Sequence, residues 1–376
     1  MRVKLEDVCE RGTSSLMQKD IVDKNGKYPV YGASGRIGSM ETYQQEHQTV
    51  AVVKDGAGIG RTMLLPEKSS VIGTMQYLIP KNCIESEYLY YVVKYMHLEK
   101  YFSGATIPHI YFRDYKTEEF NLHDKTEQRE IVSTLKRIEA IISNRQEQLT
   151  KLDELIKARF VEMFGDPLNN EKNWNTSTLA EMCDGIGDGL HGTPEYDESG
   201  EYPFINGNNL IDGAIRVNAL TKRVNKATYE KHYIEISQNA ILLSINGTLG
   251  KIAFFNGEQV MLGKSACYCN LKVEVNRIFV YNIMKTDAFA RYLEDNSTKS
   301  TIKNVGLKAI REYRLILPPL SLQKQFAAFV EEVDKSKLFV GSAAAHKPFD
   351  IGFFSQKHCA TPCKRGIISS KHMIFH

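Results

Sequence analysis

Glycines at alternate positions follow an apolar run near residue 52 and could form a phosphate-binding turn. The stretch is "VVKDGAGIG", residues 52–60, with Gly56, Gly58 and Gly60. Such turns bind nucleotides because glycine lets the backbone approach the phosphates closely. Here the spacing is GxGxG instead of GxGxxG, and the residues that follow, "RTMLLP", are β-prone and not helical. We therefore favour a hairpin turn between two strands over a nucleotide site.

Signatures of other catalytic or metal sites are weak. The sequence has no P-loop with its Lys and Ser/Thr, and "LPPL" at 317–320 lacks the polar first and aromatic last residues of the methyltransferase motif Asn/Asp-Pro-Pro-Tyr/Phe. Cys267 and Cys269 share one face of a predicted strand, but no second pair completes a tetrahedral site. "HCATPC" at 358–363 could supply ligands, yet it lies in a tail of unusual composition. We expect neither a catalytic apparatus nor a bound metal.

Length and composition are those of a globular protein. The 376 residues leave room for two domains, and 42% are hydrophobic and 25% charged. Neither a membrane span nor a signal peptide is recognisable, so we expect a cytoplasmic protein, and seven scattered cysteines do not indicate a disulfide framework. Without residues 338–376 the chain holds 43 basic and 44 acidic residues. Charge alone therefore does not indicate nucleic acid.

A repeat with an offset of 195 residues gives a stronger indication. "TEQREIVSTLKRIE" at 126–139 returns in weaker form as "SLQKQFAAFVEEVD" at 321–334. Two more pairs of stretches match, 106–122 with 301–317 and, at a shorter offset, "VVKDGAGIGR" at 52–61 with "LLSINGTLGK" at 242–251. The chain is therefore predicted to contain two copies of one structural unit.

Each predicted unit is a β-rich body with a helix near its end, at residues 86–102 and 277–293. A longer helix follows, with Thr126 as its expected N-cap and "FGDP" at 164–167 after it. Its apolar residues have heptad spacing, interrupted at Arg145, and 38 residues would span roughly 57 Å. The predicted seam residues are Ile131, Leu135, Ile138, Ile142, Leu149, Leu152 and Ile156, with Val330 and Val333 on the second helix. The heptads suit either a dimerisation coiled coil or an antiparallel pair of helices within one chain.

The combination of two variable bodies, each ending in "TI", a strand and a "Q-R/K-x-I/F" helix, with heptads between them, resembles the specificity subunit of a Type I restriction-modification system. The resemblance covers residues 1 to about 337. It implies an α+β fold in which two pseudo-repeated, β-rich target-recognition domains are joined by long helices that form an antiparallel coiled-coil spacer. The implied segments are a first domain at 1–125, a central spacer helix at 126–163, a second domain at 164–320, the start of a second spacer helix at 321–337 and an aberrant, poorly ordered tail at 338–376.

The same resemblance implies a non-catalytic reader of double-stranded DNA. Its partners would be methyltransferase subunits and restriction subunits, the motor-nucleases. It implies no cofactor for this chain, because the partner subunits would use S-adenosylmethionine and ATP. Two bodies on a rigid spacer could read half-sites about one helical turn, roughly 34 Å, apart. Because the bodies differ in sequence, we expect an asymmetric, bipartite target.

Polar and basic residues in the paired loops are the expected DNA contacts, because phosphates attract Lys and Arg and base edges attract Arg, Asn, Gln, Lys, Ser and Thr. These residues are Lys54, Arg61, Thr106, His109 and Arg113 in the first body and Asn246, Thr248, Lys251, Lys299, Ser300, Lys303 and Asn304 in the second. The same stretches could instead be simple turns and core strands. Two other functions stay open: a coiled-coil interaction scaffold without DNA readout, and an enzyme with its site in the glycine-rich loops.

The C-terminal tail does not continue the heptads. Lys337, Ala344 and Lys347 stand where the seam needs apolar residues, and Gly341 and Pro348 disfavour a helix. We hypothesise that residues from about Leu338 onward are out of register with an ancestral sequence, as after a frameshift.

Overall fold

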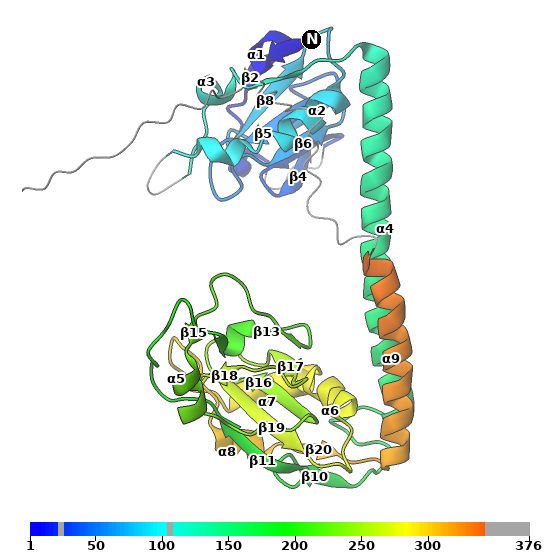
Figure 1. The fold of residues 1–376 in the computed structure, drawn as a ribbon. Coiled ribbons are helices and arrows are strands. Elements are labelled where there is room, and N and C mark those ends of the chain that lie inside the picture. The colour runs from blue at the N-terminus through cyan, green and yellow to red at the C-terminus, as the bar shows by residue number, and fades with distance from the viewer. Residues whose placement is uncertain (22–25, 104–107, 343–376) are drawn as a thin grey trace, which may run out of the picture. The chain divides into compact units, whose positions relative to one another are not determined.

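The structure, a computed structural model, describes residues 1–21, 26–103 and 108–342. These residues form two compact units, the first ending at Ser143 and the second beginning at Asn144. Helix α4 (Lys125–Phe164), with 40 residues, contributes to both units. Figure 1 shows the two units with their elements labelled.

Unit 1 is built on an antiparallel sheet of order β2-β8-β5-β6, beside a sheet of order β4-β3-β7 in which β3 and β7 are parallel. A separate antiparallel pair, β1-β9, joins the first strand of the unit to its last strand. Its elements before α4 are β1 (Arg2–Lys4), α1 (Leu5–Val8), β2 (Cys9–Thr13), η1 (Gln18–Asp20), β3 (Tyr28–Gly32), β4 (Gly35–Met40), β5 (Thr49–Val53), β6 (Thr62–Leu65), β7 (Ser70–Val71), β8 (Met75–Pro80), α2 (Ser86–Tyr95), η2 (Leu98–Tyr101), α3 (Phe112–Tyr115) and β9 (Glu119–Asn121).

The central strand β5 is buried on both faces. Val50 and Val52 pack into a core with helix α2, whereas Ala51 and Val53 pack into a second core on the other face. This alternation follows from the two-residue period of a strand, and a run of β-branched residues suits it. Strands β5 and β6 lie on the two sides of the glycine-rich stretch, where the sequence predicted the two strands of a hairpin.

Unit 2 repeats this plan with additions. Its sheet β11-β19-β16-β17 corresponds to β2-β8-β5-β6, its sheet β15-β12-β18 to β4-β3-β7, and its pair β10-β20 to β1-β9. Its elements are β10 (Thr176–Thr178), β11 (Cys183–Asp188), β12 (Tyr202–Ile205), η3 (Gly207–Asn209), β13 (Leu210–Ile211), β14 (Ala214–Ile215), β15 (Arg223–Val224), α5 (Lys226–Lys231), β16 (Ala240–Ser244), β17 (Ile252–Phe254), β18 (Met261–Leu262), β19 (Ala266–Leu271), α6 (Arg277–Met284), α7 (Asp287–Asp295), α8 (Leu307–Glu312), β20 (Arg314–Ile316) and α9 (Leu320–Ser342). The prediction of a repeated α+β unit is confirmed.

The helix predicted over residues 277–293 is two helices. The hydroxyl of Thr286 accepts a hydrogen bond from the Phe289 N–H, 3.4 Å away, and so begins α7 directly after α6 ends. In unit 1 the corresponding helix ends at Tyr95, because His97 adopts a left-handed conformation (φ +53°). The apolar period alone did not reveal these breaks, since both pieces bury apolar residues.

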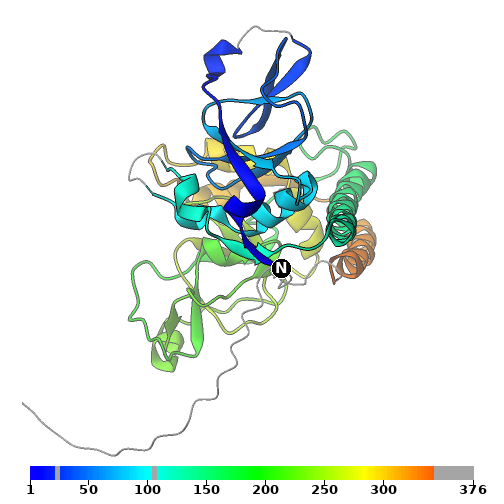
Figure 2. The same cartoon turned by 90° about the horizontal axis from the view of Figure 1, so that it is seen from above.

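Helix α9 packs antiparallel to the second half of α4, as Figures 1 and 2 show. The Lys337 ammonium lies 2.8 Å from the Asp153 carboxylate, while Phe326 packs against Phe160 and Phe164 eleven residues nearer the start of α9. Both contacts lie within unit 2. Beyond Lys337, helix α9 continues to Ser342, and the rest of the predicted tail lies outside the described residues.

The predicted seam residues are distributed over two cores and one exposed stretch. Leu135 and, partly buried, Ile131 pack in the unit 1 core, beside Val132, which the heptad count missed. Leu152, Ile156, Val330 and Val333 pack in the unit 2 core. Ile138 and Leu149 are half-buried, and Ile142 is 52% exposed.

No helix in the described part of the chain is long and apolar enough to cross a membrane.

Candidate functional site

The glycine-rich stretches are hairpin turns, one between β5 and β6 and one between β16 and β17. Gly56, Gly60, Gly247 and Gly250 all have positive φ, between +77° and +94°, a conformation that costs glycine least. A strand and not a helix follows each turn, so no helix N-terminus faces the glycines as in a phosphate-binding turn. The preference for hairpins over a nucleotide site is therefore confirmed.

Each turn is attached to a later loop of its own unit. In unit 1 the N–H of Gly56 donates to the carbonyl of Pro108, and the N–H of Ile110 donates to the carbonyl of Lys54, both at 2.9 Å. These two bonds fix the turn against the segment that carries His109.

Unit 2 repeats both bonds. The N–H of Gly247 donates to the carbonyl of Lys303, and the N–H of Val305 donates to the carbonyl of Ile245, again at 2.9 Å. Lys54 therefore corresponds to Ile245 in the structure. The ungapped match of the two sequences pairs Lys54 with Ser244 instead. The turn of unit 2 is one residue shorter, which a sequence match without gaps cannot reveal.

The two backbone hydrogen bonds form a frame between turn and loop that is the same in both units. The pair of polar side chains on this frame differs between the units. In unit 1 the Asp55 carboxylate lies 2.6 Å from Nδ1 of His109. In unit 2 the side chain of Asn246 donates to that of Asn304 at 3.1 Å. One backbone frame thus presents a carboxylate–imidazole pair in unit 1 and two amides in unit 2, and these groups offer different hydrogen-bond patterns.

The predicted cations of the unit 1 turn have partners within their unit. Lys54 lies 3.3 Å from the Asp55 carboxylate, and the Arg61 guanidinium donates to the carbonyl of Ala33 at 2.8 Å. Thr106 lies outside the described residues. The structure therefore brings Lys54 together with His109 through Asp55, and holds Arg61 at the other end of the turn.

The segment after His109 adds an exposed aromatic and a cation. The ring of Tyr111 lies nearly parallel to that of His109, with centroids 6.1 Å apart, and the Arg113 guanidinium lies 4.7 Å from the Tyr111 centroid. The Arg113 side chain is 76% exposed and 3.5 Å from the Asp114 carboxylate. Arg113 is therefore available to an anionic partner in solution.

The predicted cations of unit 2 are less neutralised. Lys251 and Lys299 form no ion pair with any described residue, whereas Lys303 pairs with Glu294. The Ser300 hydroxyl donates to a carbonyl of its own loop at 2.6 Å. Of the three lysines, Lys251 and Lys299 offer the uncompensated charge that phosphate binding requires.

A hollow of about 600 Å³ at one end of the unit 2 sheet joins four loops. It is lined by Leu190, Gly192, Thr193, Phe204, Asn206, Gly207, Asn208, Asn246, Gly247, Thr248, Gly263, Lys264 and Ser265. The sequence predicted Asn246 and Thr248 there, but missed Asn206, Asn208 and Lys264. The polar run "NGNN" directly after β12 was the available signal, because a turn at the end of a strand often carries binding residues.

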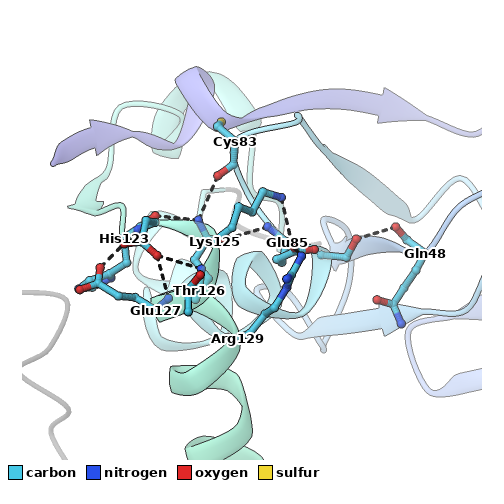
Figure 3. A network of polar contacts seen from close by, with 11 residues as sticks. Gln48, Cys83, Glu85, His123, Lys125, Thr126, Glu127 and Arg129 are labelled. Atoms are coloured by element: carbon cyan, nitrogen blue, oxygen red, sulfur yellow. Dashed lines mark hydrogen bonds and ion pairs between the residues drawn. The ribbon is translucent and has the colours of Figure 1, made fainter.

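Helix α4 is anchored on unit 1 by a buried glutamine. The Gln128 side chain, 0% exposed, accepts a hydrogen bond from the N–H of Glu85 and donates to the carbonyls of Cys83 and His123. Figure 3 shows Cys83, Glu85 and His123 around the first turn of this helix. The hydrogen bonds of Gln128 satisfy partly buried backbone groups just before α2 and just before α4.

Charged contacts complete this anchor. The Glu85 carboxylate lies 3.0 Å from Arg129 and 3.3 Å from Lys125. Burial raises the pKa of Glu85, but hydrogen bonds from Arg129 and Lys125 outweigh it and lower the pKa. The expected N-cap Thr126 is wrong: Asp124 accepts from the N–H groups of Thr126 and Glu127, at 2.9 and 3.0 Å. The helix starts earlier because a carboxylate satisfies two N–H groups at once.

The cysteines of unit 2 are core residues. Cys183, Cys267 and Cys269 are buried, and a hydrogen bond with Cys269 together with burial raises the pKa of the Cys183 thiol. Thiols that stay protonated are poor nucleophiles and poor metal ligands. No group of three or more His, Cys, Asp or Glu within the described ranges could hold a metal ion, and His358 and Cys363 lie outside those ranges.

Comparison with known proteins gives a consistent family. Residues 1–153 and 171–339 match the family described as the Type I restriction modification DNA specificity domain. The chain is 26% identical over 157 residues to the specificity subunit of Type I restriction enzyme MjaIX from Methanocaldococcus jannaschii. That match covers 36% of this chain and 36% of the relative, about a third of each length.

Solved structures agree in fold. The chain is similar to the S subunit of a Type I restriction-modification system from M. genitalium, with a TM-score of 0.57 at 17% identity over 91% of both chains. A second structure, described in connection with the assembly and conformational transition of the Type I system, gives a TM-score of 0.51 at 15% identity over 92% of both chains.

Proposed function

Because the chain belongs to the family of Type I restriction modification DNA specificity domains, we propose that it is the non-catalytic DNA-recognition subunit of a Type I restriction-modification complex. Each unit is a target-recognition domain for one half of an asymmetric, bipartite target in double-stranded DNA. The observation that carries this proposal is the pair of equivalent loop frames, Asp55–His109 in one unit and Asn246–Asn304 in the other, because one frame with different side chains reads different bases.

The loops that leave these frames are the proposed DNA contacts. Lys54, Arg61, Thr106, His109 and Arg113 serve the first half-site. The second half-site is contacted by Asn246, Thr248, Lys251, Lys299, Ser300, Lys303 and Asn304. Lysines and arginines bind phosphates, and amides, imidazole and hydroxyls reach base edges. Lys251 and Lys299, which form no ion pair with any residue in the described part of the chain, support this division.

Helices α4 and α9 are the proposed spacer. The antiparallel packing of α9 on the second half of α4, with Lys337 in contact with Asp153, supports a coiled-coil arrangement of these two helices. The seam would run from Ile131, Leu135, Ile138 and Ile142 through Leu149, Leu152 and Ile156, with Val330 and Val333 opposite. A continuous helix between two readers sets the number of unread bases between the half-sites.

The partners are methyltransferase subunits, and restriction subunits for cleavage. These partners use S-adenosylmethionine and ATP, and the chain itself holds no cofactor. We place the complex in the cytoplasm, together with the DNA that it would recognise.

The experiment is genome-wide mapping of methylated adenines in cells that carry the partner subunits, with and without this chain. A split, asymmetric motif that appears only with the chain supports the proposal. Exchange of residues 164–320 for another second domain should then change one half of the motif only. A chain that leaves the methylation pattern unchanged and binds no duplex with salt-dependent affinity would instead be an interaction scaffold.

A further inference from the structure

The hollow of unit 2 has a counterpart position in unit 1, which the backbone hydrogen bonds define. The N–H of Gly263 donates to the carbonyl of Ile205 at 2.8 Å, as that of Ile72 donates to the carbonyl of Tyr31 at 3.1 Å. The parallel pairs β12–β18 and β3–β7 have the same register. The chain that leaves β12 toward the hollow therefore corresponds to the chain that leaves β3.

A second pair of bonds extends this correspondence. The N–H of Lys264 donates to the carbonyl of Leu190 at 3.0 Å, and that of Gly73 donates to the carbonyl of Leu16 at 2.7 Å. Lys264 therefore stands where unit 1 has a glycine. A shared frame carries an ammonium group in one unit and no side chain in the other.

The two chains diverge directly after the shared frame. Unit 1 makes a tight hairpin, in which Gly32 faces Gly35 across the β3–β4 pair. Unit 2 instead forms the short helix η3, with Asn206 and Asn208 at the equivalent place. Small side chains in unit 1 thus give way to two amides and an ammonium in unit 2.

Asn208 is held rigidly by its backbone while its side chain is free. Its N–H donates to the side-chain oxygen of Asn206 at 2.9 Å, and the neighbouring Gly207 N–H donates to the Ser265 hydroxyl at 3.1 Å. Below the turn, the buried Asn209 accepts from the Asn206 N–H at 3.0 Å. The exposed Asn208 amide has no hydrogen-bond partner among the residues that the structure describes, so both its donor and its acceptor can serve a ligand.

The charge of the hollow suits nucleic acid. Lys264 is exposed and makes no ion pair within the described ranges, and none of the residues that line the hollow carries a carboxylate. The hollow is tightly packed at Gly207, because a Cβ added there would lie 2.7 Å from the Cβ of Ser244. The open sides are Gly192 and Gly247, where an added Cβ would meet no atom within 4 Å.

We propose that this hollow reads an adenine of the second half-site, with the Asn208 amide on the adenine edge and Lys264 on an adjacent phosphate. The proposal rests on the proposed function and names the base class that unit 2 recognises. An asparagine amide donates to N7 of adenine and accepts from its N6 amino group, a pairing that no other base offers in the major groove. Neighbouring Asn246 and Thr248 lie in the same hollow and contact the flanking bases.

The experiment is selection of bound duplexes from a randomised DNA library by the full-length chain, for the wild type and for Asn208→Ala and Asn208→Asp. Loss of the amide should reduce the preference for adenine at one position of one half-site by about 5- to 150-fold. The aspartate keeps the acceptor but loses the donor, so it should lose adenine as well. Ser34→Ala, in the corresponding hairpin of unit 1, is the matched control and should leave the second half-site unchanged.

The outcomes separate this proposal from the proposed function. If the wild type enriches no sequence at all, DNA recognition by the chain is wrong. If the wild type enriches a bipartite motif that Asn208→Ala leaves intact, or a second half-site without adenine, the chain recognises DNA but the hollow is not its adenine reader. Thermal unfolding of each variant verifies folding, and we expect little change, because the exposed Asn208 side chain makes no hydrogen bond with any residue that the structure describes.

Discussion

Gln323 occupies in unit 2 the position that Gln128 occupies in unit 1. Each side-chain carbonyl accepts from the backbone N–H just before a helix, at Asn276 for α6 (2.9 Å) and at Glu85 for α2 (2.8 Å). Each amide also donates to a carbonyl just before its own helix, that of Pro318 (2.7 Å) in the case of Gln323. Both glutamines are fully buried. One polar side chain thus joins a long helix, α4 or α9, to the β-rich body of its unit.

Removal of either glutamine should destabilise only its own unit. Gln323→Ala leaves buried backbone groups without partners, which costs about 1–3 kcal/mol. The single tryptophan of the chain, Trp174, packs against the unit 2 core, so its fluorescence reports the unfolding of that unit in urea. Gln323→Ala should lower the Trp174 midpoint, and Gln128→Ala should not. The control Gln146→Ala changes an exposed α4 side chain and should be neutral; an equal shift for all three variants would contradict the anchoring role.

The contact between Lys337 and Asp153 should stabilise the pairing of α9 with α4. Burial lowers the pKa of Lys337, but hydrogen bonds with Asp153 and Asp334 outweigh it and raise the pKa, so the ammonium stays charged. A double-mutant cycle of Lys337→Met and Asp153→Asn, measured by urea unfolding, should give a coupling of about 0.5–1 kcal/mol. The cycle of Lys337 with exposed Glu154→Gln is the matched control, and coupling of similar size there would argue against the antiparallel register.

Acid should loosen the attachment of α4 to unit 1. The Glu139 carboxylate accepts from Lys94 at 2.6 Å and from Tyr91 at 2.7 Å; burial raises its pKa, but these bonds outweigh burial and lower the pKa below the usual 4.5. A carboxyl whose pKa is lower in the folded state contributes stability above the unfolded-state pKa, and loses it as the pH falls through the folded-state value. The stability of unit 1 should therefore fall as the pH drops below 4.5 and through the lowered pKa of Glu139.

The size of this effect is limited by exposure, since the Glu139 side chain is 38% exposed, and solvent screening leaves less than about 1 kcal/mol. Circular dichroism during urea unfolding at a series of pH values measures it. Glu139→Gln should flatten the acid dependence, and Glu154→Gln on the exposed face of α4 should not. An unchanged profile for Glu139→Gln would exclude this carboxyl as the cause.

Loss of one phosphate-binding cation should reduce the salt dependence of DNA binding. Lys251→Gln and Lys264→Gln should each lower the slope of log K against log salt by about 0.9, because each cation releases one counterion from DNA. Lys157→Gln, which removes an exposed α4 charge, is the control. Fluorescence anisotropy with a labelled duplex measures the slopes, and equal slopes for all variants would show that neither lysine contacts phosphate.

Insertion of seven residues into α4 should change the gap between half-sites. The favourable place is between Ile142 and Arg145, after Glu139, which contacts Lys94 of unit 1, and before Asp153, which contacts Lys337 of α9. Two turns lengthen the helix by about 10 Å, or about three base pairs. Adenine mapping should return both half-sites with a different number of unread bases between them, and an altered half-site sequence would contradict the spacer.

Much of the architecture could be read from the sequence, because it rests on local patterns. The repeat was visible since Gln128 and Gln323 keep the same type and spacing in both helices. The strands of the central sheets were predictable from β-branched runs between glycines. The break at Thr286 was not, because the residues on both sides bury the same kinds of side chain and the hydroxyl cap decides where one helix ends.

By itself, the sequence determined that this protein has two related α+β units, a long helix between them and glycine turns without a nucleotide-binding pattern. Only the tertiary structure decided which loops meet: Asn208, Asn246 and Lys264 come from three separate loops that line one hollow. The physical reason is that period and turn chemistry act over a few residues, whereas a binding surface depends on strand register and on hydrogen bonds between distant loops. The turn that follows Ile245 in unit 2 is one residue shorter than the turn that follows Lys54 in unit 1. A difference of this size decides which side chains of a turn reach the binding surface.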